Sequence, residues 1–570
     1  MSRWWAALAG VVAAAAGLAV AELVAAWVAP GSSPVFAAGA AVVDAVPGWL
    51  KDLAVAWFGT ADKAVLLGTM GAVLLAGAAL AGVLEVRRPP SGEVLVIAVG
   101  VVAALVATVR PGASAAWALP SVIGIGAAVV LLRVIAGRLR DWSTAQEQVA
   151  AWAGAPTSAA ADDTAAADAA ADTAADDAAD DTADADAAAD TAADDAAEAE
   201  RSDAREAELG RRRFLQLTGL TAAGAVVALA ASRVVGAGAR AAQHVRAALR
   251  LPAPATPAPA VPAGAELGIP GLATYITPDD TFYRIDTALR VPVVDTDTWS
   301  LRVHGLVDTP FELTWAELLE LPLEEHHVTL TCVSNYVGGD LVGNALWLGY
   351  PVRELLARAG PHDDADMVLS RSIDGFTAGT PLEVLLDPDR QCLLAIGMNG
   401  QPLPLDHGFP ARLVVPGLYG YVSATKWVTE LKVTRFADDV AYWTSRGWSA
   451  RGPIKLESRI DVPGSGDAVS PGSDGSVVVA GVAWAQHTGI RAVEVQVDGG
   501  PWEAATLADT VGPDTWRQWR FVWDAAASGG GEHTLRVRAT DAKGHVQTAD
   551  SAPPPPDGAT GWHEIGVSVR

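Results

Sequence analysis

Cys332 is the side chain whose type and position most clearly suggest chemistry. It lies in the segment TLTCVSN (329–335), at the predicted end of a strand that enters a loop containing Gly338 and Gly339. A thiol at a strand end, beside exposed polar backbone, is where proteins usually present a soft metal ligand or a nucleophile. Spacing alone leaves a buried structural cysteine open as the alternative. No histidine or aspartate lies at an offset diagnostic of a Cys–His protease.

The second cysteine, Cys392, has the sequence context of a core residue. It lies in the apolar segment QCLL (391–394), where a thiol packs as a small hydrophobe. A Cys332–Cys392 disulfide stays open as an alternative. Because the 570-residue chain has two cysteines, it excludes a disulfide framework, a four-cysteine zinc site and a cysteine-ligated iron–sulfur cluster.

The elements that position these residues follow a strongly apolar N-terminal region. We predict a transmembrane block at 1–140 with about four helices, because each apolar run is near the ~20 residues that cross a bilayer. Flanking arginines put both ends of the block in the cytoplasm, and 31–60 is interpreted as an interfacial or re-entrant piece. The runs are about 4–28, 64–85, 93–109 and 117–136.

The N-terminal block has the composition of an anchor or a partner-docking platform. Its first 243 residues contain no histidine, which excludes a membrane haem held by paired histidines. Few charged groups lie inside the predicted spans, so an ion path is not indicated. A transporter is the alternative.

Charge is concentrated in one segment after this block. The chain has 40 Lys and Arg against 66 Asp and Glu, and residues 161–200 hold 15 acidic residues and no basic one. Without a basic domain, nucleic-acid binding is excluded. Residues 155–200 repeat Ala, Asp and Thr with almost no bulky apolar group, and we predict a disordered, acidic, cytoplasmic linker at 141–210.

The next segment, 211–237, resembles a twin-arginine export signal. Arg211, Arg212 and Arg213 precede Phe-Leu-Gln and an apolar, Ala/Gly-rich run, and we predict a signal or anchor helix that is retained. A plain final transmembrane helix is the alternative. Both interpretations place the arginines on the cytoplasmic side and everything after about 236 on the extracytoplasmic side. We therefore predict a multi-pass protein of the plasma (inner) membrane. A Pro/Ala-rich linker is predicted at 238–264.

Residues 265–450 change to short β-like runs, turn signals and amphipathic helices. Residues 299–305 alternate like a strand, 315–321 and 352–359 are predicted helices, and three apolar strands follow at 391–397, 411–416 and 426–434. The fold prediction is an α+β domain.

Several ordered segments of this domain resemble the sulfite oxidase family of molybdopterin enzymes. They are Phe282–Arg284 (FYR), 331–335 (TCVSN), 349–360 (GYPVRELLARAG), 374–377 (DGFT), 398–404 (MNGQPLP), 407–417 (HGFPARLVVPG) and Lys426-Trp427. The resemblance implies a sulfite-oxidase-like fold and a Mo-molybdopterin cofactor with one molybdenum per chain. Cys332 occupies the position of the family's molybdenum ligand.

The resemblance also implies a set of cofactor-binding residues. A buried phosphate needs charge-assisted donors, which Arg412 and Lys426 can supply. Taken singly, Arg412 is also compatible with a surface strand and His407 with a turn; the combined pattern favours binding. The full set is Tyr283, Arg284, Cys332, Ser372, His407, Arg412, Ser423, Ala424, Thr425 and Lys426.

The chain departs from the family's sulfite-binding pattern near Cys332. Where animal and plant sulfite oxidases have arginines after the cysteine motif, this sequence has Tyr336 and Val337, and Ile396 replaces a tyrosine before MNG. A pocket without those donors binds sulfite poorly. Bacterial periplasmic reductases of the family, some acting on methionine sulfoxide, are the nearer analogy. Asn335 and Tyr336 are predicted to line the substrate pocket.

Residues 451–570 contain regular short strands. A hairpin is predicted at Asp498-Gly499-Gly500, and the pattern predicts an all-β sandwich. It resembles the immunoglobulin-like domain that follows the molybdenum domain in sulfite oxidases and often mediates dimerisation, so a homodimer is implied. Its tryptophans are predicted to lie in the core or an interface; they are Trp484, Trp502, Trp516, Trp519 and Trp523.

Together these features predict a membrane-anchored, extracytoplasmic molybdopterin oxidoreductase performing oxygen-atom transfer on a small oxyanion, sulfoxide or similar molecule. The chain has no haem-attachment motif, iron–sulfur ligand set or flavin fingerprint, so electrons are expected to pass to a separate cytochrome or quinone-linked partner. A sulfite oxidase or dehydrogenase proper is the enzymatic alternative. A non-catalytic, membrane-tethered binding module is the alternative from another class.

Overall fold

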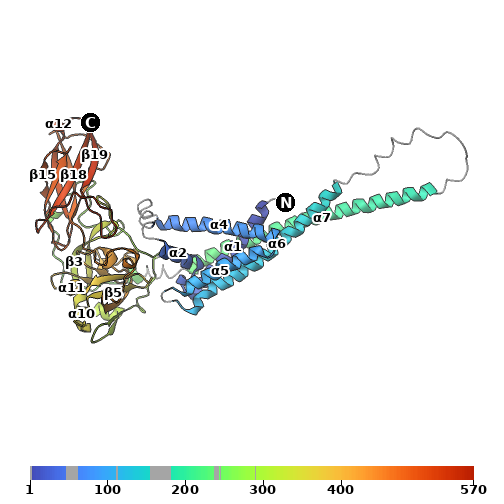
Figure 1. Cartoon of the computed structure of the whole chain (residues 1–570), viewed down its shortest axis with the longest axis horizontal. Helices are drawn as coiled ribbons and strands as arrows, with labels where there is room; N and C mark the ends of the chain where they lie inside the picture. The colour runs from blue at the N-terminus through green and yellow to red at the C-terminus, as the bar shows by residue number, and fades with distance from the viewer. Residues whose placement is uncertain are drawn as a thin grey trace. The chain divides into compact units, whose positions relative to one another are not determined.

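The structure, a computed structural model, describes residues 3–46, 50, 62–110, 113–153, 181–235, 243, 245–288 and 291–570. The chain divides into two compact units, 1–42 with 64–237, and 43–63 with 238–570. Figure 1 shows a helical first unit and a β-rich second unit.

The first unit is built from long apolar helices. Five helical segments are long and apolar enough to cross a membrane: Arg3–Val28, Val65–Arg87, Ser91–Thr108, Ala115–Ala150 and Arg201–Ala230. They include the four runs predicted from the sequence. The helices are α1 (Arg3–Val28), α2 (Pro34–Ala45), α4 (Asp62–Arg87), α5 (Ser91–Thr108), α6 (Leu119–Ala153) and α7 (Asp181–Val235).

The linker prediction for 141–210 is wrong where the structure describes the chain. Residues 141–153 continue α6, and 181–210 form the first half of α7. Alanine has the highest helix propensity of all residues, and in these segments it outweighs repulsion between the carboxylates. Residues 154–180 lie outside the described part. Of the piece predicted at 31–60, residues 34–45 form α2 and most of the rest is likewise outside.

The twin-arginine-like segment packs into the helical unit. Phe214 on α7 is fully buried, and its ring centroid lies 5.8 Å from that of Trp5 on α1 and 5.9 Å from that of Trp142 on α6. Charged groups inside this unit are paired: Arg133 Nε donates to Glu93 Oε1 at 2.7 Å. Pairing of this kind is how charges are accommodated at membrane depth.

The second unit begins with a β-rich domain holding two sheets. One has the strand order β2-β1-β10-β5-β6, and the other β3-β4-β7-β8, with β9 paired to β7. The strands are β1 (Ser300–Gly305), β2 (Phe311–Thr314), β3 (Glu324–Thr331), β4 (Val342–Pro351), β5 (Met367–Ser372), β6 (Thr377–Pro381), β7 (Leu393–Met398), β8 (Gln401–Pro402), β9 (Arg412–Val414) and β10 (Val428–Thr434).

Three short helices accompany these sheets: α9 (Trp315–Glu320), α10 (Val352–Ala359) and α11 (Leu382–Leu386). A capping box starts α9, because Thr314 accepts a hydrogen bond from the Glu317 backbone N–H and the Glu317 carboxylate accepts one from the Thr314 backbone N–H. Gly360, with a φ of 69°, ends α10. Both helices lie where the sequence predicts them, as does β1.

The C-terminal domain is all β apart from one helical turn, α12 (Ala525–Ser528). Its sheets have the orders β11-β13-β17-β16 and β12-β19-β18-β14-β15, which agrees with the predicted sandwich. The strands are β11 (Glu457–Val462), β12 (Ala468–Val469), β13 (Ser476–Trp484), β14 (Ile490–Val497), β15 (Trp502–Ala504), β16 (Thr506–Leu507), β17 (Arg517–Asp524), β18 (Gly531–Asp541) and β19 (His563–Val569).

The predicted hairpin joins β14 to β15, with Gln496 paired to Trp502. Asp498 and Gly499 have φ values of 51° and 70°, the left-handed pair that a tight hairpin turn needs. Trp519 and Trp523 fill the sandwich core. Trp484 and Trp516 instead pack with Tyr275 and Val342 of the preceding domain, so the two domains share an apolar junction.

Candidate active site

The loop between β3 and β4 carries Cys332. The hairpin register pairs Thr331 with Val342, and Cys332 donates its backbone N–H to the Leu341 carbonyl at 2.9 Å. The thiol is free, as is that of Cys392, so the disulfide alternative is wrong. Burial raises the pKa of the Cys332 thiol. A metal ion bound there would deprotonate it outright.

Two cavities meet at this thiol. The residues that line both are Ile285, Cys332, Gly420, Ala424 and Lys426. The first cavity extends along an aromatic and carboxylate-bearing wall that includes Asp286, Ser372, Asp374, Phe376, Tyr421, Trp427, Trp443 and Trp448. The second extends toward Phe282, Tyr283, His407 and Arg412. We call the first the aromatic arm and the second the cationic arm.

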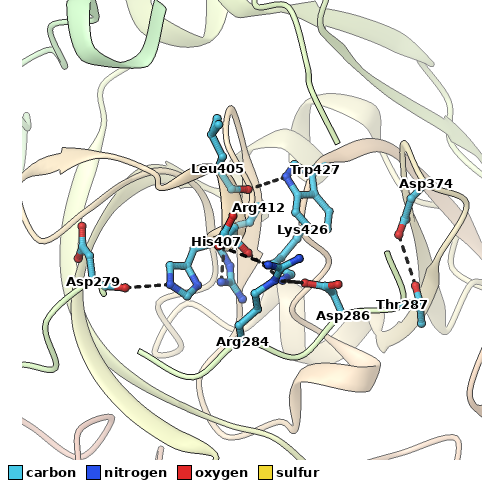
Figure 2. A network of polar contacts seen from close by, with 11 residues as sticks. Asp279, Arg284, Asp286, Thr287, Asp374, Leu405, His407, Arg412, Lys426 and Trp427 are labelled. Carbon is cyan, nitrogen blue, oxygen red and sulfur yellow. Dashed lines mark hydrogen bonds and ion pairs between the residues drawn. The ribbon is translucent and has the colours of Figure 1, made fainter. Parts of the chain in front are cut away.

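Lys426 lies between the two arms and is held by an acidic partner. Its Nζ donates to Asp286 Oδ2 at 2.6 Å and to the Asp406 carbonyl at 2.9 Å. Arg284 Nε donates to the same Asp286 oxygen at 3.0 Å, and Figure 2 shows both cations converging on that carboxylate. Burial lowers the pKa of Lys426 to about 8, although Asp286 opposes the shift.

Arg412 is a buried cation of a different kind. Its side chain starts on β9, is 5% exposed, and lies with its guanidinium carbon 5.0 Å from the ring centroid of Trp347. Among the described residues it donates to two backbone carbonyls, of His407 at 3.2 Å and Leu413 at 3.3 Å. Burial lowers its pKa to about 10. A buried guanidinium bonded to carbonyls favours an added anion.

His407 and Tyr283 are the neutral polar groups of the cationic arm. His407 Nε2 donates to the Asp279 carbonyl at 3.1 Å, which fixes the tautomer with the proton on Nε2. Burial, then Arg412 and Lys426, lower its pKa to about 4, so the ring is neutral at pH 7. Burial raises the pKa of Tyr283, and the phenol stays a hydrogen-bond donor.

Comparison with known proteins identifies the family. Residues 288–443 match the model described as "Oxidoreductase molybdopterin binding domain", and 457–537 match the "Bacterial Ig domain". The oxidoreductase YuiH of Bacillus subtilis is 33% identical over 158 residues, which cover 28% of this chain and 76% of that protein. The chain belongs to the sulfite-oxidase-like family of molybdopterin oxidoreductases.

Longer relatives match about half of this molybdopterin oxidoreductase. Human mitochondrial sulfite oxidase is 31% identical over 325 residues, which are 49% of this chain and 58% of the human protein. The chain therefore spans a little over half the length of that relative. The structure of the sulfane dehydrogenase SoxCD from Paracoccus pantotrophus is 25% identical, with a TM-score of 0.42, covering 49% of this chain and 76% of that one.

Most of the predicted cofactor-binding residues of this family member come together. Those that line a cavity are Tyr283, Cys332, Ser372, His407, Arg412, Ala424 and Lys426. Arg284 reaches the site through Asp286. Ser423 and Thr425 line neither cavity and instead hold the segment that carries Ala424 and Lys426. Ser423 Oγ donates to the Tyr419 carbonyl at 2.9 Å, and Thr425 Oγ1 lies 2.7 Å from Ser370 Oγ.

The two residues predicted to line the substrate pocket do not line either cavity. Asn335 is buried with its side chain turned toward the immunoglobulin-like domain, where Nδ2 donates to Glu457 Oε2 at 3.4 Å. Tyr336 is 47% exposed. Val333 and Ser334 still line the aromatic arm, and the loop turns away from Asn335 onward, where Asn335 Oδ1 accepts the Leu341 N–H at 2.9 Å.

Sequence reasoning missed several residues of the aromatic arm. Asp286 follows Arg284 by two positions. An acidic residue so close to a predicted cofactor-binding arginine was the signal that could have indicated it as a partner of that arginine. Trp443 and Trp448 follow Lys426-Trp427, the last segment that resembles the family, and their own segment has no local sequence pattern. Tertiary packing brings them to the cavity: their ring centroids are 6.1 Å apart, and Trp448 lies 5.7 Å from Tyr421.

The donor set fits a molybdopterin cofactor. A soft thiol lies beside two buried cations, and one of these, Arg412, lacks a carboxylate acceptor among the described residues. The cofactor brings a phosphate, which such a guanidinium binds well. Tyr283, His407 and Ser372 would meet the polar edge of the pterin, and Cys332 would hold the metal.

Proposed function

We propose that this chain is a membrane-anchored oxidoreductase that transfers an oxygen atom at a molybdenum held by Cys332. The observation that carries the proposal is the position of the Cys332 thiol, where an aromatic arm and a cationic arm meet beside Lys426. When bound, the cofactor supplies two-electron chemistry at molybdenum. The protein's part is to bind, orient and exclude water.

The substrate is proposed to be neutral rather than an oxyanion. The two cations that line the cavities are already committed: Lys426 pairs with Asp286, and Arg412 lies in the cationic arm proposed to take the phosphate. The aromatic arm adds a further carboxylate at Asp374, which repels an anion. A sulfoxide or a similar uncharged acceptor suits such a wall.

Sulfite oxidation is the second candidate. It is favoured by the relatives that carry that name, including the human protein at 31% identity over 49% of this chain. It is disfavoured by the residues after Cys332. Tyr336 is exposed outside the cavities, and Ile396 is fully buried in β7, so neither supplies a donor for an anion.

The membrane arrangement belongs to the same proposal. Five helical segments have the length and apolar character of membrane spans, and the arginine distribution puts Arg211–Arg213 inside. The catalytic domain then lies on the extracytoplasmic side of the plasma (inner) membrane. Electrons are exchanged with a separate cytochrome or quinone-linked protein. A homodimer through the C-terminal domain remains a prediction from the family resemblance.

One experiment separates the two enzymatic candidates. The purified full-length protein is assayed with organic sulfoxides and a reduced viologen dye, and with sulfite and an artificial electron acceptor. We expect about one molybdenum per chain by elemental analysis and turnover of the sulfoxide. Turnover of sulfite alone would contradict the neutral-substrate proposal.

The matched variants are Cys332→Ser and Cys392→Ser. Cys332→Ser is expected to abolish turnover because it removes the metal's thiolate. Cys392 is 2% exposed, belongs to the main core cluster and lines neither cavity, so Cys392→Ser is expected to retain activity. Undiminished activity in Cys332→Ser would show that the ligand assignment is wrong.

A further inference from the structure

The loop that carries Cys332 is held by the immunoglobulin-like domain. Arg459 on β11 donates from Nη1 to the Gly339 carbonyl at 2.8 Å. Two positions earlier on the same strand, Glu457 Oε2 accepts the Asn335 amide at 3.4 Å. Asn335 and Gly339 both lie in the turn between Cys332 and Leu341. Side chains of the C-terminal domain therefore contact both sides of this turn.

The side chains of Glu457 and Arg459 that make these contacts are buried. Glu457 is 2% exposed, and its Oε1 has no hydrogen-bond partner within the described part of the chain. The Arg459 side chain is 11% exposed and its Nε donates to Asp461 Oδ1 at 2.5 Å. A buried, half-satisfied carboxyl is costly, and folds retain such groups where geometry matters more than stability.

The turn itself is shaped to receive that domain. Gly338 has a φ of 78°, and a Cβ there would lie 2.2 Å from Cδ2 of His563 on β19. A Cβ on Gly339 would lie 2.7 Å from Asn335 Oδ1. The C-terminal domain also contacts the strand before the turn, since Gln486 Nε2 donates to Thr331 Oγ1 at 3.0 Å.

Asn335 transmits these contacts to the thiol. Its backbone N–H donates to the Cys332 carbonyl at 3.1 Å, while its side chain links the Leu341 N–H to Glu457. Cys332 in turn donates its N–H to Leu341. The orientation of the Cys332 backbone is thus set by a closed ring of hydrogen bonds among Cys332, Asn335 and Leu341, and Glu457 of the C-terminal domain holds this ring from outside through the Asn335 side chain.

We propose that Glu457 and Arg459 are positioning residues that act through Asn335 and Gly339 to fix the thiol of Cys332 for metal binding. The C-terminal domain then contributes to the metal centre as well as to any self-association. The proposal rests on the proposed function for its role in catalysis. The positioning itself can be measured in protein without cofactor, so the two can fail separately.

The test measures how fast each cysteine is alkylated in the cofactor-free, full-length chain, by mass spectrometry. Labelling of a buried thiol requires local opening, and losing a hydrogen bond worth about 1 kcal/mol raises the open population about fivefold. We expect Glu457→Ala and Arg459→Met to speed labelling of Cys332 about fivefold. Labelling of Cys392, in the core of the molybdopterin domain, is expected to be unchanged.

Two further variants separate positioning from general destabilisation. Glu457→Gln keeps an oxygen that accepts the Asn335 amide, and its Cys332 labelling is expected to be no faster than that of the wild type. Glu503→Ala, at an exposed site on β15 of the same domain, is the control and is expected to change neither thiol. In loaded enzyme, Glu457→Ala is expected to lower kcat about fivefold with KM unchanged.

Cys332 labelling equal to the Glu503→Ala control in both Glu457→Ala and Arg459→Met would overturn the proposal. If these variants expose both thiols, the domain has opened as a whole. Glu457→Asp, which withdraws the carboxyl by one methylene, then decides: faster labelling of Cys332 alone supports positioning, and unchanged labelling rejects it. Absence of molybdenum from wild-type protein would instead contradict the proposed function.

Discussion

Arg412 is the residue at which binding and stability conflict. Its buried guanidinium is bonded to carbonyls, so without an anion it pays part of the cost of an unpaired buried charge. We expect Arg412→Met to stabilise the cofactor-free chain by about 1–2 kcal/mol, while molybdenum content falls sharply. Chemical unfolding in detergent and elemental analysis measure the two effects.

The control for this prediction is Arg371→Met. Arg371 is 40% exposed at its side chain and pairs with Glu430 across the strand surface, so its loss is expected to stay within about 0.5 kcal/mol. A destabilised Arg412→Met protein with normal molybdenum content would show that the guanidinium serves the core and not the cofactor.

Glu457 predicts a pH dependence of stability with a definite sign. Burial raises its pKa from 4.5 to about 8, while the Asn335 hydrogen bond and the charge of Arg459 lower it by less. Tyr419 also lies within electrostatic reach of Glu457. A raised carboxyl pKa contributes stability that is fully present below pH 4.5 and is lost as pH rises through 8. Glu457→Gln is neutral at every pH, so its free energy of unfolding is expected to rise relative to that of the wild type between pH 4.5 and 8.

The size of that gain is on the order of 4 kcal/mol at pH 8, from about 1.36 kcal/mol for each pH unit. Free energies of unfolding of both proteins between pH 4 and 8 provide the measurement. Parallel pH profiles would show that the carboxyl ionises normally in the folded chain.

At the scale of elements, the β3–β4 loop depends on Gly338. Its φ of 78° strains any side chain, and a Cβ would overlap the His563 ring. Gly338→Ala is therefore expected to cost at least about 2 kcal/mol, with faster labelling of Cys332. Gly566→Ala on β19, where nothing lies within 4 Å of the added Cβ, is the control. Equal stability of the two variants would contradict the tight packing of this loop.

At the scale of the molecule, the proposed topology separates two exposed sites. In intact spheroplasts, a membrane-impermeant maleimide is expected to label Ala260→Cys, which follows the last candidate membrane span, and to spare Ser202→Cys, which precedes Arg211–Arg213 on α7. Both positions are exposed, and both native cysteines are buried, so background labelling is low. Inside-out vesicles should reverse the pattern. Labelling of Ser202→Cys in spheroplasts would invert the proposed orientation.

Local patterns were sufficient for much of this architecture. The apolar runs, α10 and the Asp498-Gly499 hairpin depend on composition, periodicity and turn chemistry, all of which act over a few residues. Cys332, Arg412 and Lys426 belonged to ordered motifs, and the structure brings them to one cleft. Local reasoning failed at 181–210, where alanine's helix propensity outweighed the charge pattern.

Tertiary structure decided what surrounds the thiol. Asn335 and Tyr336 are near Cys332 in sequence but face away, because the turn packs on the C-terminal domain through Glu457. Trp443 and Trp448, more than a hundred residues away, form the cavity wall instead. The sequence by itself determined the family and the cofactor class, which depend on residue types in short segments. Side-chain direction was decided by long-range packing, because distant elements compete for the same few positions around a buried atom.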